Sequence, residues 1–212
     1  MCVLKLENVS YSYASSKKPV IEGLSFRFEK GNIYSIVGRS GAGKTTLLSL
    51  LSGLASPTGG NIYMDGKDIK KIDKYEYRSR YVGVIFQSFN LLPKLTALEN
   101  VILSMDIAGK KFDDKKEYAM NLLKKVSLSE EEGNRRILKL SGGQQQRVAI
   151  ARTLSYGPEI ILADEPTGNL DGETQTEIMN IFKELAHEED KCVILVTHSP
   201  VVADQSDVVY KL

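Results

Sequence analysis

The stretch "IYSIVGRSGAGKT" constrains the fold of this 212-residue chain more than any other. Residues 38–45 fit the pattern G-x-x-x-x-G-K-[ST], after a short apolar run and before helical spacing from about Lys44 to Ser52. A strand, a glycine-rich loop and a helix in this order surround phosphate groups with backbone N–H donors. The predicted phosphate-binding residues are Gly38, Arg39, Ser40, Gly41, Ala42, Gly43, Lys44, Thr45 and Thr46. Lys44 is expected to reach the β- and γ-phosphates, and Thr45 to bind Mg²⁺.

Three further apolar runs predict the rest of a sheet. They are "YVGVIF" (81–86), "IILA" (160–163) and "CVILVT" (192–197). Short runs that are apolar throughout are typical of parallel strands covered on both faces. The first thirty residues alternate instead, which predicts antiparallel strands on either side of a turn at 14–19. We therefore expect an α/β fold with a mostly parallel sheet, in a P-loop NTPase (RecA-like) core, and an N-terminal antiparallel β-subdomain.

Residues 88–155 have a different, helical character and predict a lobe inserted into this core, which would comprise 1–87 and 156–212 of a single domain. "TALEN" (96–100) carries a T-x-x-E capping box. The segment 113–126 predicts an amphipathic helix with Tyr118, Leu122 and Val126 on one face, and the polar stretch 129–136 predicts a loop.

The lobe ends in a second motif, "LSGGQQQR" (140–147). Ser141 and Gln144 have the spacing of a capping box, and Val148, Ala151 and Leu154 recur at helical spacing. A helix that opens on two glycines leaves its N–H groups bare, which suits an anion. One chain thus carries two candidate phosphate sites about a hundred residues apart.

Each of the four apolar runs gives way to a residue that can bind phosphate, metal or water. Besides the glycine loop these are Gln87, the pair Asp164 and Glu165, and His198. A lone histidine or an Asp-Glu pair at a strand end is more often an ordinary surface feature. Here the ends of parallel strands share one edge with the glycine loop, where open sheets bind their ligands. We predict that Asp164 and Thr45 hold Mg²⁺ and that Glu165 is the general base.

The other two residues at this edge of the sheet, His198 and Gln87, are predicted to assist phosphate binding and hydrolysis. His198 is expected to contact the γ-phosphate or position the attacking water, and Gln87 to reach Mg²⁺ or that water. His187, in "ELAHEED", is expected to be a surface residue.

The composition limits the kinds of partner and the cellular setting that we expect for this chain. Lys+Arg 28 against Asp+Glu 27 gives a net charge of +1, so no nucleic acid is expected. The two cysteines lie far apart and match no metal or redox spacing. The sequence contains no run of about 18 apolar residues, so we expect no membrane-spanning helix. The cysteine usage leads us to expect a reducing, cytosolic setting. The start "MCVLKLENVS" carries charge, so we expect no signal peptide.

Taken together, "GRSGAGKT", "LSGGQQQR" and "IILADEPTGNLD", with Gln87 and His198, resemble the ATPase subunits of ATP-binding cassette (ABC) transporters. "VIFQSFNLLPKLTALENV" (84–101) and "ADEPTGNLD" (163–171) are similar to the branch serving macrolide export, lipoprotein release and bacitracin-type peptide resistance, and to a cell-division relative. The resemblance implies a homodimer that closes head to tail on two ATP molecules. One subunit's P-loop would hold each ATP, and the other's Ser141, Gly142, Gly143 and Gln144 would cover it.

The resemblance also implies further positions. Tyr13 matches the aromatic residue that stacks on adenine, with Tyr11 as the competitor and strand packing as the alternative for both. Asn169, Leu170 and Asp171 match a loop that links the two sites, although Asp171 also suits a helix cap. Gln87 to Pro93 and the helical lobe would receive an integral membrane permease at the cytoplasmic face of the membrane, with Leu91, Leu92 and Pro93 forming an exposed apolar patch.

Three functions compete on this evidence. The leading prediction is the ATP-hydrolysing subunit of a transporter, whose membrane partner exports a molecule or transmits motion. The others are an ATPase of a non-transport membrane complex, as in cell division, and a soluble non-transport ABC protein. The chain shows no long heptad pattern and one cassette only, which disfavours the soluble class.

Overall fold

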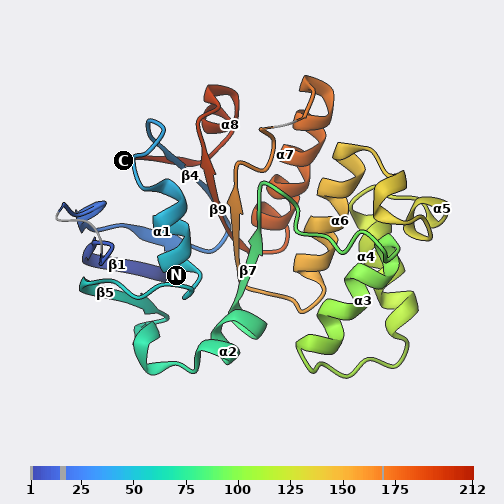
Figure 1. Cartoon of the computed structure of the whole chain (residues 1–212), viewed down its shortest axis with the longest axis horizontal. Helices are drawn as coiled ribbons and strands as arrows, with labels where there is room; N and C mark the ends of the chain where they lie inside the picture. Colours follow the sequence, from blue (N-terminus) through green and yellow to red (C-terminus); the bar gives the residue numbers. More distant parts are fainter. Residues whose placement is uncertain (1, 15–17, 169) are drawn as a thin grey trace.

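The computed structural model describes residues 2–14, 18–168 and 170–212. Its centre is a parallel sheet with strand order β10-β4-β9-β8-β7 (Figure 1). The four predicted runs form β4 (Asn32–Val37), β7 (Val82–Ile85), β8 (Ile160–Asp164) and β9 (Cys192–Thr197). The edge strand β10 (Val208–Lys211) pairs in parallel with β4 and was not predicted.

A second, antiparallel sheet forms the subdomain predicted from the first thirty residues. β1 (Cys2–Tyr11) pairs with β2 (Ile21–Leu24), β3 (Arg27–Glu29) and β5 (Gly59–Met64), and β6 (Lys67–Asp68) extends β5. The contribution of β5 and β6 was not foreseen. The predicted turn at 14–19 includes residues 15–17, which lie outside the described part of the chain.

Alternate residues of the parallel strands enter two different cores, as the two-residue period of a strand requires. In β9, Ile194 and Val196 belong to the core shared with the antiparallel sheet and helix α1 (Lys44–Leu51). Val193 and Leu195 belong to the core shared with helix α7 (Gly172–His187) and the helical lobe. Both faces of the sheet are therefore covered, which explains why its strands are apolar throughout.

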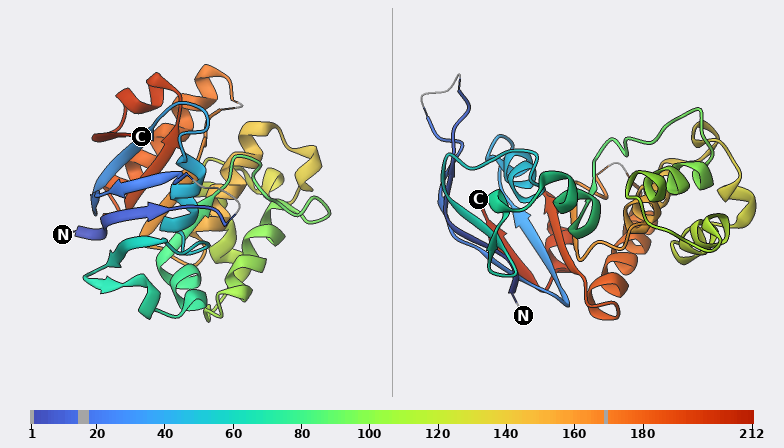
Figure 2. Two further views of the ribbon diagram at one scale, coloured as in Figure 1. Left: turned by 60° about the vertical axis from the view of Figure 1, so that its left-hand side comes forward. Right: turned by 90° about the horizontal axis from the view of Figure 1, so that it is seen from below.

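The helical lobe lies on the opposite side of the molecule from the antiparallel sheet (Figures 1 and 2). It contains α3 (Ala97–Ile107), α4 (Lys115–Lys125), α5 (Glu130–Gly133) and α6 (Gly142–Leu154). The predicted capping box of α3 is present, because Thr96 and Glu99 each bond to the other's backbone N–H. The short elements elsewhere are η1 (Ile69–Lys71), α2 (Lys74–Glu76), η2 (Tyr77–Tyr81), η3 (Ile137–Lys139) and α8 (Pro200–Asp204).

One local prediction for the lobe was wrong and another was partly right. The stretch 129–136 is not all loop, because Ser129 and Glu132 form a capping box that starts α5. Of the predicted face of the second helix, Val126 is buried and Leu122 packs against the core, whereas Tyr118 is 38% exposed. The buried residues within α4 are Ala119, Met120 and Leu123. Several apolar residues on α4 compete for the core, and the packing against α3 and α6, rather than the spacing alone, decides which enter it.

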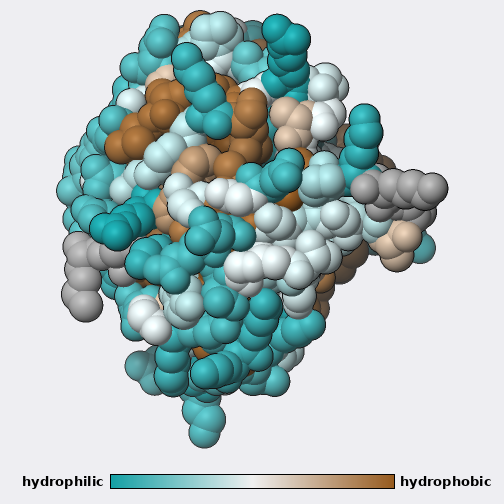
Figure 3. Space-filling model, turned by 90° about the vertical axis from the view of Figure 1, so that its left-hand side faces the viewer, coloured by the Kyte–Doolittle hydropathy of each residue, from teal (hydrophilic) through white to brown (hydrophobic). Residues whose placement is uncertain are grey.

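The face of the molecule that carries the antiparallel sheet is largely hydrophilic, with apolar residues gathered in its upper part (Figure 3). Among the described helices, none has the length and hydropathy needed to cross a bilayer.

Candidate functional site

The glycine loop has the geometry that its sequence predicts. It connects β4 to α1, and Gly43, at the N-cap of α1, has a φ of 94°. A Cβ atom at this position would lie 2.9 Å from Val20 Cγ1. Only glycine fits here, because the positive φ disfavours residues with a side chain and because a Cβ atom would clash with Val20, which precedes β2. The loop is thus held between the two sheets with the N–H groups of α1 at its end.

The Lys44 side chain folds back over the glycine loop and bonds to its backbone carbonyl groups. Its Nζ donates to the carbonyl oxygen of Gly38 at 2.9 Å and to that of Arg39 at 3.3 Å. Its ammonium group therefore lies across the concave side of the loop, where it can neutralise the charge of a phosphate.

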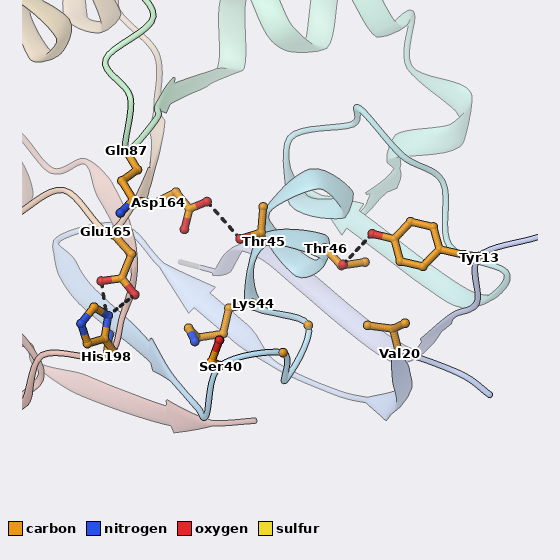
Figure 4. A pocket seen from close by; sticks show the side chains of 12 residues that line it. Tyr13, Val20, Ser40, Lys44, Thr45, Thr46, Gln87, Asp164, Glu165 and His198 are labelled. Atoms are coloured by element: carbon orange, nitrogen blue, oxygen red, sulfur yellow. Dashed lines mark hydrogen bonds and ion pairs between the residues drawn. The ribbon is translucent and has the colours of Figure 1, made fainter. Parts of the chain in front are cut away.

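A pocket of about 500 Å³ opens beside this loop (Figure 4). It brings together residues that flank β1 and β2, residues of the glycine loop and α1, and residues at or just beyond the ends of β7, β8 and β9. The predicted residues that line it are Tyr13, Ser40, Gly41, Gly43, Lys44, Thr45, Thr46, Gln87, Asp164, Glu165 and His198. Gly38, Arg39 and Ala42 belong to the loop without lining the pocket, and Val20 lines it without having been predicted.

Thr45 and Asp164 meet in this pocket. Thr45 Oγ1 donates to Asp164 Oδ2 at 3.1 Å. Burial raises the pKa of the Asp164 carboxyl, and the hydrogen bond from Thr45 partly opposes that shift. A hydroxyl and one carboxylate beside a phosphate loop fit Mg²⁺, which takes few protein ligands and completes its shell with water and phosphate oxygens. Among the described residues, no group of three or more His, Cys, Asp or Glu side chains is placed to hold a metal by itself.

Glu165 is fixed from three sides. His198 Nδ1 lies 2.6 Å from Oε1, while Thr197 Oγ1 and the His198 backbone N–H donate to Oε2 at 3.2 and 3.3 Å. The Glu165 side chain is 12% exposed and that of His198 is 70% exposed. Glu165 also has a φ of 46°, an uncommon conformation for a non-glycine residue, and such strain clusters at functional sites. The carboxylate is therefore held in one orientation at the pocket.

The geometry favours Tyr13 over Tyr11 as the aromatic residue of the site. Tyr13 lines the pocket, is 47% exposed and shares a hydrogen bond of 2.9 Å with Thr46 Oγ1. Tyr11 packs against the core behind it, with its ring edge-on to that of Tyr13 at a centroid distance of 5.1 Å. A flat ligand can stack only on the outer ring.

The SGGQ motif lies outside this pocket. Ser141 caps α6 by accepting from the Gln144 backbone N–H at 3.2 Å, and Gln144 Oε1 accepts from the Ser141 backbone N–H at 2.8 Å. Ser141 and Gly142 are exposed, Gly143 and Gln144 are half-buried, and none of the four lines the pocket. The Gln144 amide also donates to Glu132 Oε1 at 2.6 Å, a contact that the sequence did not predict.

The predicted linking loop is described only in part. Asp171 is the N-cap of α7, where its side chain accepts from the backbone N–H and the hydroxyl of Thr174 at 2.9 and 2.8 Å. These hydrogen bonds lower the pKa of the Asp171 carboxyl. The capping alternative therefore holds within the monomer. Asn169 lies outside the described residues.

Comparison with known proteins gives a consistent result. The ABC transporter family profile matches residues 21–168. An uncharacterized ABC transporter ATP-binding protein, YclH of Bacillus subtilis, is 47% identical over 212 residues, covering 100% of this chain and 94% of that protein. The macrolide export ATP-binding/permease protein MacB of Syntrophobacter fumaroxidans is 41% identical over 210 residues, covering 96% of this chain and 29% of that protein.

A solved structure is also similar over nearly the whole chain. The dimeric, post-hydrolysis ATP-binding cassette MJ0796, bound to ADP and Pi, has a TM-score of 0.89 and 38% identity, covering 99% of this chain and 94% of that one. A protein of the same name is known from Methanocaldococcus jannaschii. The predicted α/β P-loop fold is confirmed. The chain belongs to the ABC transporter family and is an ATP-binding, ATP-hydrolysing subunit of that family.

Proposed function

We propose that two copies of this chain close head to tail on two Mg²⁺·ATP and thereby drive a separate membrane subunit. One observation carries this proposal: the nucleotide pocket and the Ser141–Gln144 turn, which starts with two exposed residues, occupy different places on one chain. A second copy would bring its own turn to the open side of the pocket. The similar cassette MJ0796 is described as dimeric with ADP and Pi, which supports this arrangement.

Within each composite site the residues divide the work. Glu165, held by His198 and Thr197, would accept the proton of the attacking water, and the exposed His198 ring would contact the γ-phosphate. Lys44 would neutralise the phosphates, and Tyr13 would stack on adenine. Thr45, Asp164 and Gln87 would hold Mg²⁺, which supplies charge stabilisation at the phosphate oxygens.

We further propose that the membrane subunit docks beside the loop 87–93 and the helical lobe. The predicted patch there is partly correct, because Leu92 is 46% exposed whereas Leu91 packs against the core. A pocket of about 270 Å³ lies between η2 and the end of α3 and is lined by Tyr75 and Ile107, each 58% exposed. Exposed apolar side chains around a groove suit a short amphipathic helix.

A separate permease chain at the cytoplasmic face of the membrane is part of this proposal, and the names of two relatives support it. MacB is named as both ATP-binding and permease protein, and this chain covers 29% of it but 94% of YclH. The cargo class proposed from the sequence resemblance is a macrolide, a lipoprotein or an antimicrobial peptide, either exported or acted on through transmitted motion. An ATPase of a cell-division complex is the alternative.

The test is to purify a tagged Glu165→Gln variant from solubilised native membranes with Mg²⁺·ATP and identify its partners by mass spectrometry. A stoichiometric membrane protein is expected, and it should be lost from a Glu165→Gln/Leu92→Glu double variant that still binds ATP. A membrane partner with a large extracytoplasmic domain would favour transmitted motion. Recovery of cell-division proteins would establish the alternative, and recovery of soluble assemblies alone would contradict the proposal.

A further inference from the structure

The loop that follows Gln87 contains two consecutive residues in the left-handed region. Phe89 has a φ of 59° and Asn90 a φ of 51°. Asparagine tolerates this conformation, and Ser88 Oγ donates to its side-chain oxygen at 2.9 Å. A bulky residue such as phenylalanine does not, and it stays there only when its surroundings hold it. Something must therefore fix this turn.

Phe89 itself packs against the core, and Arg152 provides a second restraint. Its Nη2 donates to the carbonyl oxygen of Phe89 at 2.7 Å, and its Nη1 donates to that of Asn90 at 2.5 Å. One planar guanidinium thus bonds to both carbonyls of the left-handed pair, and its rigid fork fixes their relative direction. The Arg152 residue is half-buried, and this burial lowers the pKa of its guanidinium group.

Arg152 lies in the last turn of α6, and the other end of the same helix starts at Ser141. A helix of 13 residues is roughly 20 Å long. Its inner face is fixed by Val148, Ala151 and Leu154, which are buried in the core. The helix is therefore a packed rod, with the SGGQ turn at one end and the Gln87 loop held at the other.

We propose that Arg152 is a positioning residue for ATP hydrolysis. It holds the loop 88–90 so that Gln87 reaches the nucleotide pocket of its own chain. It also connects this loop to α6, whose first residues would meet the nucleotide bound by the partner. The proposal rests on the function proposed above. Movement of the SGGQ end of α6 on dimer closure is then transmitted through the Arg152 fork to the Gln87 loop, so that one helix connects the two sites.

A purely structural role for Arg152 predicts a different result, and a double-mutant cycle separates the two. Residues that act through one another give non-additive effects, whereas independent residues give effects on the rate that multiply. The variants are Arg152→Gln, Gln87→Ala and their combination, measured by steady-state ATPase activity of the purified full chain. Binding of a fluorescent ATP analogue without Mg²⁺ and thermal unfolding are measured alongside.

We expect Arg152→Gln to lower kcat by about 10- to 100-fold and to raise the Mg²⁺ concentration for half-maximal activity, with Mg²⁺-free nucleotide binding changed less than about twofold. The double variant should be no slower than Gln87→Ala. Arg152→Lys keeps the charge but not the fork, so it should restore part of the rate and also preserves the test if Arg152→Gln folds poorly.

Arg147 is the matched control. It lies in the same helix and also donates to a backbone carbonyl, that of Val126 at 2.8 Å, but away from the Gln87 loop. The effect of Arg147→Gln should multiply with that of Gln87→Ala. Multiplying effects for Arg152 as well, or a parallel loss of Mg²⁺-free nucleotide binding, would overturn the proposal. A wild-type chain whose isolated monomers hydrolyse ATP at the full rate would instead count against the proposed function.

Discussion

The side-chain amide of Gln144 donates to Glu132 Oε1 at 2.6 Å, and this bond joins two helix caps in series. Glu132 Oε2 accepts from the backbone N–H and hydroxyl of Ser129 at 2.7 and 2.8 Å, and thereby completes the cap of α5. Gln144 completes the cap of α6 with Ser141. The SGGQ turn is thus held in place by Glu132, which precedes Gln144 by twelve positions.

Replacing Glu132 by alanine should loosen both caps. Loss of a cap costs about 1 kcal/mol of unfolding free energy, which denaturant unfolding at pH 7 would detect. The hydrogen bonds from Ser129 lower the pKa of Glu132, so its contribution is present above the unfolded pKa of about 4.5 and is lost as pH falls through the lower folded value. The difference between wild type and Glu132→Ala should therefore shrink below pH 4.5. A difference that stays constant on acidification would contradict this assignment.

The two glycines that open α6 should respond differently to alanine. A Cβ at Gly143 would lie 2.6 Å from Thr174 Cγ2, whereas a Cβ at Gly142 would lie 3.9 Å from its nearest neighbour. Gly143→Ala should lower the unfolding free energy by about 1–3 kcal/mol, because overpacking forces α6 away from α7. Gly142→Ala, the matched control, should change it by less than about 1 kcal/mol. Equal effects in chemical denaturation would show that α6 and α7 are not in close contact there.

Asp164 should cost the nucleotide-free protein stability at neutral pH. Burial raises the pKa of Asp164 in the folded state above its pKa in the unfolded state. The free energy of unfolding therefore falls as the pH rises from the unfolded-state pKa to the higher folded-state pKa. Asp164→Asn should raise the nucleotide-free melting temperature at pH 7 and lose the further stabilisation that Mg²⁺ adds in the presence of ATP. Calorimetry with and without Mg²⁺ tests both parts. An unchanged or lower melting temperature for Asp164→Asn would show that the buried charge is compensated.

Most of the fold followed from the sequence because its four central strands are apolar throughout and each ends in a functional residue. β10 was missed because four residues, two of them exposed, give little signal without the neighbouring strand. The antiparallel partner β5 was missed because it starts with two glycines and its pairing with β1 spans about fifty residues.

Most of the pocket residues were predicted because their motifs are local. Val20, Glu132 and Arg152 were not, because each acts through a contact with a residue distant in sequence. Arg152 is the clearest case, since it meets Phe89 and Asn90 across more than sixty positions. No periodicity or motif signals such a bond before the helix is placed.

Glu165→Gln should separate nucleotide binding from hydrolysis. The amide keeps the size of the side chain but cannot accept a proton, so kcat should fall by about 10²- to 10⁴-fold. ATP affinity should stay within about twofold, because the P-loop and Tyr13 are unchanged. Single-turnover hydrolysis and equilibrium binding measure the two quantities. A hydrolysis rate close to that of wild type would remove Glu165 from the role of general base.

The central claim is that each complete site needs two chains, and mixing two inactive variants tests it most directly. Lys44→Ala disables the P-loop side and Ser141→Arg disables the SGGQ side, so a mixed dimer would contain one intact site. Random pairing should restore up to about a quarter of the wild-type ATPase rate. A mixture of Lys44→Ala with Glu165→Gln, both on the P-loop side, should stay inactive. If Lys44→Ala and Ser141→Arg remain as inactive together as apart, the composite site is contradicted.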